Sequence, residues 1–144
     1  MDINIRKATK EDYQNVMKLY GEFVGNPQRF IQNNNDSYMK VIEDPNSHLD
    51  VAIIVHEIVA FVMYTTRTVV RYPKPIIEVD ELFISPDYRR RGIGRRLIEH
   101  ILAFAKAHNY HYVFAASANE RVAGHKLYEK LEFDKYGLHY RRKP

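Results

Sequence analysis

The sequence predicts an α+β fold, in which helices flank a twisted, mostly antiparallel mixed sheet, within a single domain that covers residues 1–144. Three observations predict it. Two apolar, β-branched-rich runs, Leu49 to Val55 and Ile58 to Thr66, follow each other as a hairpin. From Ile76 onward, strand and helix patterns alternate, which implies one parallel crossover. The content of 45% apolar and 28% charged residues is typical of a globular domain.

The N-terminal quarter predicts one strand and two helices. Apolar residues alternate with polar ones from Ile3, which predicts a strand that ends near Thr9. Thr9 and Asp12 have the spacing of a helix N-cap pair, and the helix that follows is expected to end near Gly25. A second helix is expected from about Arg29 to Ile42, before the hairpin begins.

After the hairpin, strands and helices are expected in turn. The elements are a strand Ile76–Ile84, a helix Ile93–His108, a strand Tyr110–Ala116, a helix from about Arg121 to Leu131, and a last strand near Lys135–Arg141. The apolar residues of the long helix recur every three or four positions, so one stripe of that helix should face the core.

The segment that joins the strand ending at Ile84 to the next helix is rich in arginine and glycine. Gly92 and Gly94 let the backbone turn tightly and approach a ligand closely. The start of the helix adds unpaired N–H groups and the positive end of its dipole. Arginine side chains add forked hydrogen bonds that suit phosphate. These features predict a pyrophosphate cradle at a helix N-terminus. Its expected residues are Arg89, Arg90, Arg91, Gly92, Ile93, Gly94 and Arg95.

This cradle differs from both common nucleotide-binding loops. Leu97 stands where the dinucleotide fingerprint requires a third glycine, and the chain lacks the Gly-Lys-Ser or Gly-Lys-Thr of a P-loop. The segment instead resembles the cofactor loop of the GNAT superfamily of acyl-CoA-dependent N-acyltransferases, through Arg89, Gly92 and Gly94. A later stretch, Gly124 to Phe133, is similar to the family's second signature, with Glu132 where that signature has glycine.

The resemblance implies an N-acetyltransferase. Such an enzyme would take acetyl-CoA as co-substrate and move the acetyl group directly to a primary amine, of a small molecule or a peptide, in a ternary complex. The strands Ile76–Ile84 and Tyr110–Ala116 would be the central strands that splay apart to admit the cofactor arm. Leu82, Phe83 and Ile84 would pair with pantetheine as with an added strand. Asn119 resembles the side chain that hydrogen-bonds this arm.

Acetyl transfer to an amine needs a proton acceptor, because an alkyl ammonium has a pKa of about 10.4. Three carboxylates precede the loop. Period-two alternation predicts Glu78 and Asp80 on one face of their strand and Glu81 on the other. Glu78 stands where some family members place their base, so it is the expected catalytic base. Asp80, Glu81 and a water chain are the alternatives.

Two further groups complete the expected chemistry. Tyr128 matches the phenol that donates a proton to the leaving thiolate in the family, and it is the expected catalytic acid. A backbone N–H near Ile84 is expected to stabilise the oxyanion.

Composition narrows the remaining classes of function. The chain has no cysteine, and its seven histidines lack metal-ligand spacing, so no metal site is expected. The net charge of +4 favours anionic partners. A nucleic-acid binder is disfavoured, because the basic loop opens a helix whose apolar stripe must be buried. No apolar run is long enough to span a membrane and no signal peptide is expected, which suggests a cytoplasmic protein.

Two alternatives concern the chain's role and assembly. A non-catalytic acyl-CoA sensor would keep the cradle without a usable acid and base. The last expected strand offers an edge at which a second copy could pair, as a homodimer. The sequence does not identify the amine acceptor or the preferred acyl chain.

Overall fold

The computed structural model describes residues 1–26, 34–118 and 120–144. Within these residues, the sheet has five strands in the order β1-β2-β3-β4-β5. They are β1 (Asn4–Lys7), β2 (Ser47–Ile54), β3 (Glu57–Arg67), β4 (Ile76–Ile84) and β5 (Val113–Ala115). Strands β1 to β4 pair antiparallel, and β4 pairs with β5 in parallel. The predicted mixed, mostly antiparallel sheet is confirmed.

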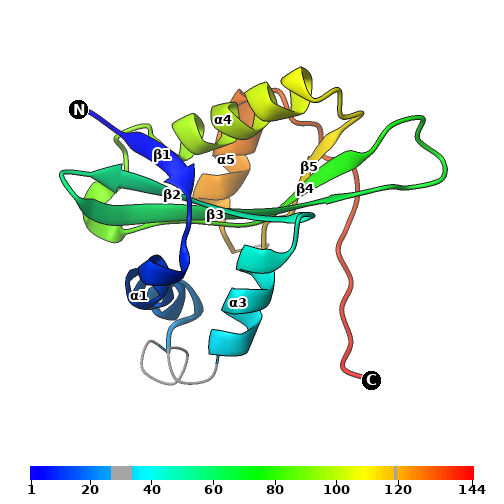
Figure 1. Ribbon diagram of the computed structural model, residues 1–144. Coiled ribbons are helices and arrows are strands. Elements are labelled where there is room, and N and C mark those ends of the chain that lie inside the picture. The colour runs from blue at the N-terminus through cyan, green and yellow to red at the C-terminus, as the bar shows by residue number, and fades with distance from the viewer. Residues whose placement is uncertain (27–33, 119) are drawn as a thin grey trace.

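Helices cover both faces of the sheet (Figure 1). Helices α1 (Tyr13–Val24) and α3 (Asn35–Glu43) lie on one face, called the α1/α3 face below. Helices α4 (Ile93–Ala107) and α5 (Val122–Lys130) lie on the other, the α4/α5 face. Each face has its own buried cluster, with Phe61 and Phe83 in the first and Ile77 and Leu97 in the second. Both clusters are needed because helices cover the sheet on both sides.

The start and end of α1 follow the expected local signals. The Thr9 N–H donates to Asp12 Oδ2 at 2.8 Å, so the predicted N-cap pair is present. Arg6 binds the same carboxylate at 2.6 Å. Gly25 ends the helix in the left-handed conformation, with φ 79°. The expected second helix is confirmed only as α3, which begins at Asn35, and its predicted start lies outside the described residues.

Strand β4 contains a β-bulge. Tyr64 of β3 pairs with Val79, whereas the preceding Met63 pairs with Glu81. Asp80 is therefore the extra residue on β4. A bulge bends its strand, increases the local twist and interrupts the alternation of side chains. The direction of β4 changes at this residue.

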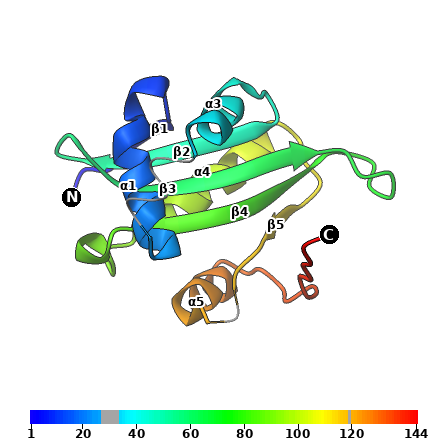
Figure 2. The same cartoon turned by 90° about the horizontal axis from the view of Figure 1, so that it is seen from below.

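The separation between β4 and β5 begins at the bulge. Parallel pairing joins Ile77, Glu78 and Val79 to β5. The last contact is the Ala116 N–H, which donates to the Val79 carbonyl at 3.0 Å. Among the described residues, no strand pairs with residues 80–84 of β4 on that side, and α5 flanks the side from which β5 diverges (Figure 2). The predicted splay of these two strands is confirmed.

The predicted last strand is wrong. Residues 133–144 form no strand, although Tyr136, Leu138 and Tyr140 alternate as expected. These side chains are 67%, 73% and 87% exposed. Alternation alone does not form a strand, because each backbone group also needs a partner in a ladder. The segment instead makes side-chain contacts, such as the 5.4 Å contact between the Tyr136 and Phe114 rings. In the described sheet β5 is consequently an edge strand, not a central one.

Candidate active site

The loop between β4 and α4 has the backbone geometry of an anion site. Arg90 and Gly92 both adopt left-handed conformations, with φ 62° and 76°. The first helical bond runs from the Arg96 N–H to the Gly92 carbonyl at 3.0 Å. Among the described residues, the N–H groups of residues 93–95 donate to no acceptor. Helix α4 therefore presents free donors and the positive end of its dipole at this loop, which suits a phosphate group.

The two glycines of the loop are required for different reasons. A Cβ on Gly92 would meet nothing within 4 Å, so its left-handed φ is what favours glycine. A Cβ on Gly94 would lie 3.1 Å from Ile84 Cδ1 and 3.2 Å from Leu127 Cδ2. Gly94 therefore lets the first turn of α4 pack closely against β4 and α5.

The arginines of the loop are held in part by local contacts. Arg89 Nε donates to the Ile84 carbonyl at 3.0 Å, and its guanidinium lies 5.3 Å from the centre of the Phe83 ring. Arg91 donates to the Asp87 carbonyl at 3.1 Å. Arg95 Nε pairs with Glu99 Oε1 at 2.7 Å. Within the described chain, the Arg90 side chain makes no hydrogen bond or ion pair.

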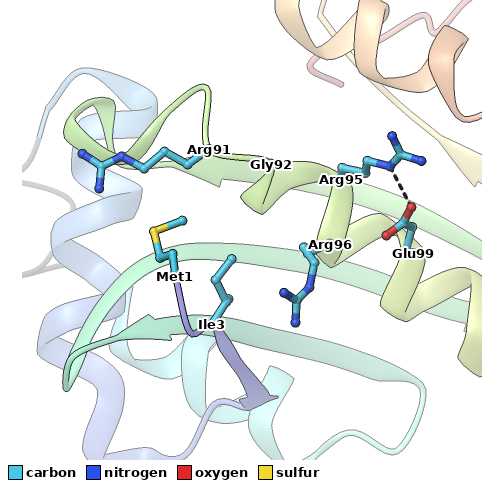
Figure 3. Close-up of a pocket in the computed structure, with 7 residues that line it drawn as sticks. All are labelled: Met1, Ile3, Arg91, Gly92, Arg95, Arg96 and Glu99. Atoms are coloured by element: carbon cyan, nitrogen blue, oxygen red, sulfur yellow. Dashed lines mark hydrogen bonds and ion pairs between the residues drawn. The ribbon is translucent and has the colours of Figure 1, made fainter.

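An open hollow of about 530 Å³ lies beside the same loop (Figure 3). It is lined by Met1, Ile3, Arg91, Gly92, Arg95, Arg96 and Glu99. The hollow lies between the first turns of α4 and the start of β1, whereas Gly94 faces β4 and α5. It is thus on the opposite flank of α4 from the separation of β4 and β5.

Residues 80–84 of β4 expose backbone groups to the space between β4 and β5, called the opening below. The Ser85 N–H donates to the Val59 carbonyl of β3 at 2.8 Å. Successive residues of a strand point their peptide groups in opposite directions. Leu82 and Ile84 therefore direct their N–H and C=O groups toward the opening, and Phe83 directs its own toward β3. The Phe83 side chain packs in the core of the α1/α3 face.

Tyr128 lies on α5, the helix that flanks the side from which β5 diverges (Figure 2). Its side chain is 9% exposed, and burial raises the pKa of its hydroxyl to about 12. Within the described chain, no hydrogen bond is recorded for that hydroxyl. The phenol therefore stays protonated at neutral pH and can donate a proton. Asn119, the other residue expected on this side, lies outside the described residues.

The carboxylates of β4 do not lie as alternation predicts. The Tyr20 hydroxyl donates to Glu81 Oε1 at 2.9 Å, and Tyr20 belongs to the core of the α1/α3 face. The expectation that Glu81 points to the opposite face from Asp80 is therefore wrong. The bulge at Asp80 is the physical reason, because it shifts the alternation by one residue.

Each carboxylate has a different partner. Glu78 Oε2 binds Arg67 at 2.8 Å. Asp80 Oδ2 accepts a hydrogen bond from Thr65 at 3.1 Å. Burial raises the pKa of Asp80 and the pKa of Glu81. The partner Tyr20 lies 61 positions from Glu81 in the chain, and the sequence offered no signal for this contact.

Two further findings concern metal ligands and membrane spans. Within the described ranges, no cluster of three or more histidine, aspartate or glutamate side chains is placed to hold a metal ion. None of the described helices is long and apolar enough to cross a membrane.

Residues 8–133 match the family described as Acetyltransferase (GNAT) family. The chain belongs to this family. It is 30% identical over 112 residues to the peptidyl-lysine N-acetyltransferase YjaB of Salmonella typhimurium, covering 73% of this chain and 68% of that protein. It is also 36% identical over 66 residues to the N-acetylaspartate synthetase of Rattus norvegicus. That match covers 44% of this chain and only 22% of the synthetase.

Solved structures share the fold over the whole chain. An aminoglycoside acetyltransferase from an uncultured soil metagenomic sample has a TM-score of 0.86 at 18% identity, covering 100% of this chain and 99% of that one. A transcriptional regulator from Bacillus halodurans has a TM-score of 0.86 at 20% identity, with 99% of both chains covered. At this identity the likeness shows the fold alone.

Proposed function

We propose that this chain transfers an acetyl group from acetyl-CoA directly to a primary amine in a ternary complex. One observation carries the proposal: β4 and β5 part beside the N-terminus of α4, and α5, the helix that carries the buried Tyr128, flanks the side from which β5 diverges (Figure 2). In the proposed site, the start of α4 would bind phosphate, the edge of β4 would pair with amides and the phenol of Tyr128 would donate a proton. Acetyl-CoA has a diphosphate, a chain of amides and a thioester in the same order.

The cofactor would bind along the β4 side of the opening. Its pyrophosphate would accept hydrogen bonds from the N–H groups of residues 90–95, with the arginines of the loop around it. Its pantetheine amides would pair with the peptide groups of Leu82 and Ile84. Arg89, which donates to the Ile84 carbonyl at 3.0 Å, would give up this contact to the cofactor. Asn119 is the proposed side-chain partner of the same arm.

The chemistry would proceed by direct attack. A neutral amine attacks the thioester carbon, and the electron pair of the C=O bond moves to oxygen. The N–H of Leu82 or Ile84 would stabilise this oxyanion, because both groups face the opening. When the C=O bond forms again, the C–S bond breaks and the thiolate takes the hydroxyl proton of Tyr128. The proton that the nitrogen loses restores the phenol, so a neutral amine and the thioester give amide and thiol, and one further proton leaves to solvent only when the amine arrives as an ammonium.

The acceptor amine would approach from the α1/α3 face, where Glu78, Asp80 and Glu81 gather. Relatives bear names that point to several acceptors, among them peptidyl lysine and aspartate. Glu78 is the base expected from its position in the sequence, and its ion pair with Arg67 at 2.8 Å holds it in place. The lack of cysteine supports a cytoplasmic setting for this reaction.

An amine panel tests the proposal. The protein is mixed with acetyl-CoA and, in turn, a lysyl peptide, a peptide with N-terminal alanine, aspartate and an aminoglycoside, and thiol release is followed. We expect amine-dependent thiol release for at least one acceptor and acetyl-CoA binding by calorimetry. Binding without transfer to any amine would favour a non-catalytic sensor, and absence of binding would refute the cradle itself.

A further inference from the structure

We propose that Glu81 accepts the proton of the incoming ammonium and that Tyr20 is the residue that positions it. The inference rests on the proposed function and assigns the base that the sequence left among three carboxylates. It is carried by the bulge in β4, by the contact between α1 and β4, and by the partners of the neighbouring carboxylates.

The bulge places Glu81 next to the reacting atoms. Asp80 is the extra residue, and Glu81 follows it on the α1/α3 face, from which the amine arrives. The peptide bond that follows Glu81 carries the N–H of Leu82, which faces the opening. The side chain of Glu81 is therefore one residue from a donor that would hold the oxyanion.

Tyr20 fixes the orientation of the Glu81 carboxylate. Its hydroxyl donates to Glu81 Oε1 at 2.9 Å. The Tyr20 ring is 7% exposed and is stacked on Phe61 with 4.0 Å between the ring centres. Because stacking holds the ring, the hydroxyl holds the carboxylate in one place. A fixed carboxylate can take a proton in a defined geometry.

The other two carboxylates are less suited to this role. Both oxygens of Glu78 already have partners: Arg67 binds Oε2 at 2.8 Å, and His139 Nε2 lies 3.4 Å from Oε1. These contacts hold the Glu78 carboxylate at Arg67 and His139. Asp80 is held toward β3 by the Thr65 hydroxyl at 3.1 Å. Glu81 is the carboxylate of the three that contacts α1, through Tyr20.

The electrostatic surroundings favour Glu81 as a base. Burial raises the pKa of Glu81, and the negative charge of Asp80 raises it further. The hydrogen bond from Tyr20 and the positive charge of Arg121 lower it. Among the described residues, these are the groups that act on this carboxylate from β4, α1 and the segment before α5. A carboxyl with a raised pKa is better matched to proton transfer near neutral pH.

The proton step is balanced. The ammonium N–H bond breaks, its electron pair stays on nitrogen, and the proton forms an O–H bond on Glu81. The neutral amine then attacks as described above. The Glu81 carboxyl afterwards releases this proton to water and returns to its charged form.

Isosteric substitutions test the assignment. With an acceptor found in the amine panel, we expect Glu81→Gln to lower kcat/KM by about 10² to 10⁴-fold, because positioned proton transfer is worth about that much. Glu78→Gln should lower it far less. Acetyl-CoA affinity, measured by calorimetry, should be unchanged in both variants. Circular dichroism checks that both fold, and Glu81→Asp should restore part of the activity.

Tyr20→Phe tests the positioning role through pH. The substitution keeps the stacked ring and removes the donor to Glu81, so the pKa of Glu81 rises. The acidic limb of the kcat/KM profile should therefore move to higher pH, by about one unit. Tyr64→Phe is the matched control, because Tyr64 is a buried tyrosine that donates to Asp50 Oδ2 at 3.0 Å in the core of the α4/α5 face. Its pH profile should match that of the wild type.

The outcomes separate this inference from the proposed function. If the wild type is active and Glu81→Gln is equally active, the inference alone is contradicted. It is also contradicted if the acidic limb of the kcat/KM profile of Tyr20→Phe stays in place or moves to lower pH. A wild type that binds acetyl-CoA and acetylates no amine contradicts the proposed function, and the inference with it.

Discussion

Gly94→Ala should disturb both the stability and the activity of this protein, for a steric reason. The added Cβ would lie 3.1 Å from Ile84 Cδ1 and 3.2 Å from Leu127 Cδ2, whereas carbon atoms pack best at about 3.5–4.0 Å. Both neighbours must therefore move by a few tenths of an ångström. Overpacking of this kind costs about 1–3 kcal/mol, and the better helix propensity of alanine offsets up to about 1 kcal/mol. A net loss of about 1 kcal/mol in the free energy of unfolding is expected.

The effect on activity should exceed the effect on stability. Leu127 precedes Tyr128 on α5, so a displaced Leu127 shifts the proposed proton donor. We expect kcat to fall by about tenfold, since a misplacement of about 1 Å can cost about 10²-fold and the shift here is smaller. Urea unfolding measures the loss of stability, and thiol release measures kcat.

A second substitution isolates the cause. Ile84→Val deletes Cδ1, the atom closest to the new methyl group. Gly94→Ala should therefore cost less stability in the Ile84→Val background than in the wild type. Strict additivity of the two changes, or a Gly94→Ala variant as stable and as active as the wild type, would refute the steric explanation.

Three other changes test the remaining parts of the molecule. Tyr128→Phe should lower kcat by about 10² to 10⁴-fold and leave the calorimetric affinity for acetyl-CoA unchanged, because it removes only the proton donor. Arg90→Ala should weaken acetyl-CoA binding about fivefold at low salt and less at high salt, because exposed charges are screened. Arg6→Met should remove a contribution of at most about 1 kcal/mol at pH 7, because the pair is partly exposed. The Arg6 guanidinium lowers the pKa of Asp12, so this contribution is present above the unfolded pKa and is lost as the pH falls through the folded pKa. The difference between urea midpoints at pH 7 and pH 3 should therefore shrink in Arg6→Met.

For each of these three predictions, one result would contradict it. Unchanged kcat in Tyr128→Phe would remove this phenol as the acid. Lys106→Ala, at the opposite end of α4, is the control for Arg90→Ala, and an equal loss of affinity in both would indicate a general charge effect. A pH dependence of stability that is identical in Arg6→Met and the wild type would show that the pair with Asp12 contributes nothing.

Much of the fold could be predicted because local signals were strong. The strand Ile76–Ile84 was predicted with the bounds that β4 has. The capping contact of Thr9 with Asp12 and the end of α1 at Gly25 are local as well. These features depend on residues that are neighbours in the chain. The prediction of the last strand failed because a strand there would need a partner strand from a distant part of the chain.

The amino-acid sequence by itself determined most of the helices and strands, the separation of two neighbouring strands through family resemblance, and the position of the loop rich in arginine and glycine. Only the tertiary structure decided which carboxylate meets which partner. A bulge at Asp80 depends on how β4 is registered against β3, and no local pattern encodes that register. The contact of Tyr20 with Glu81 joins α1 to β4 across 61 positions, so it exists only after the helix has packed on the sheet.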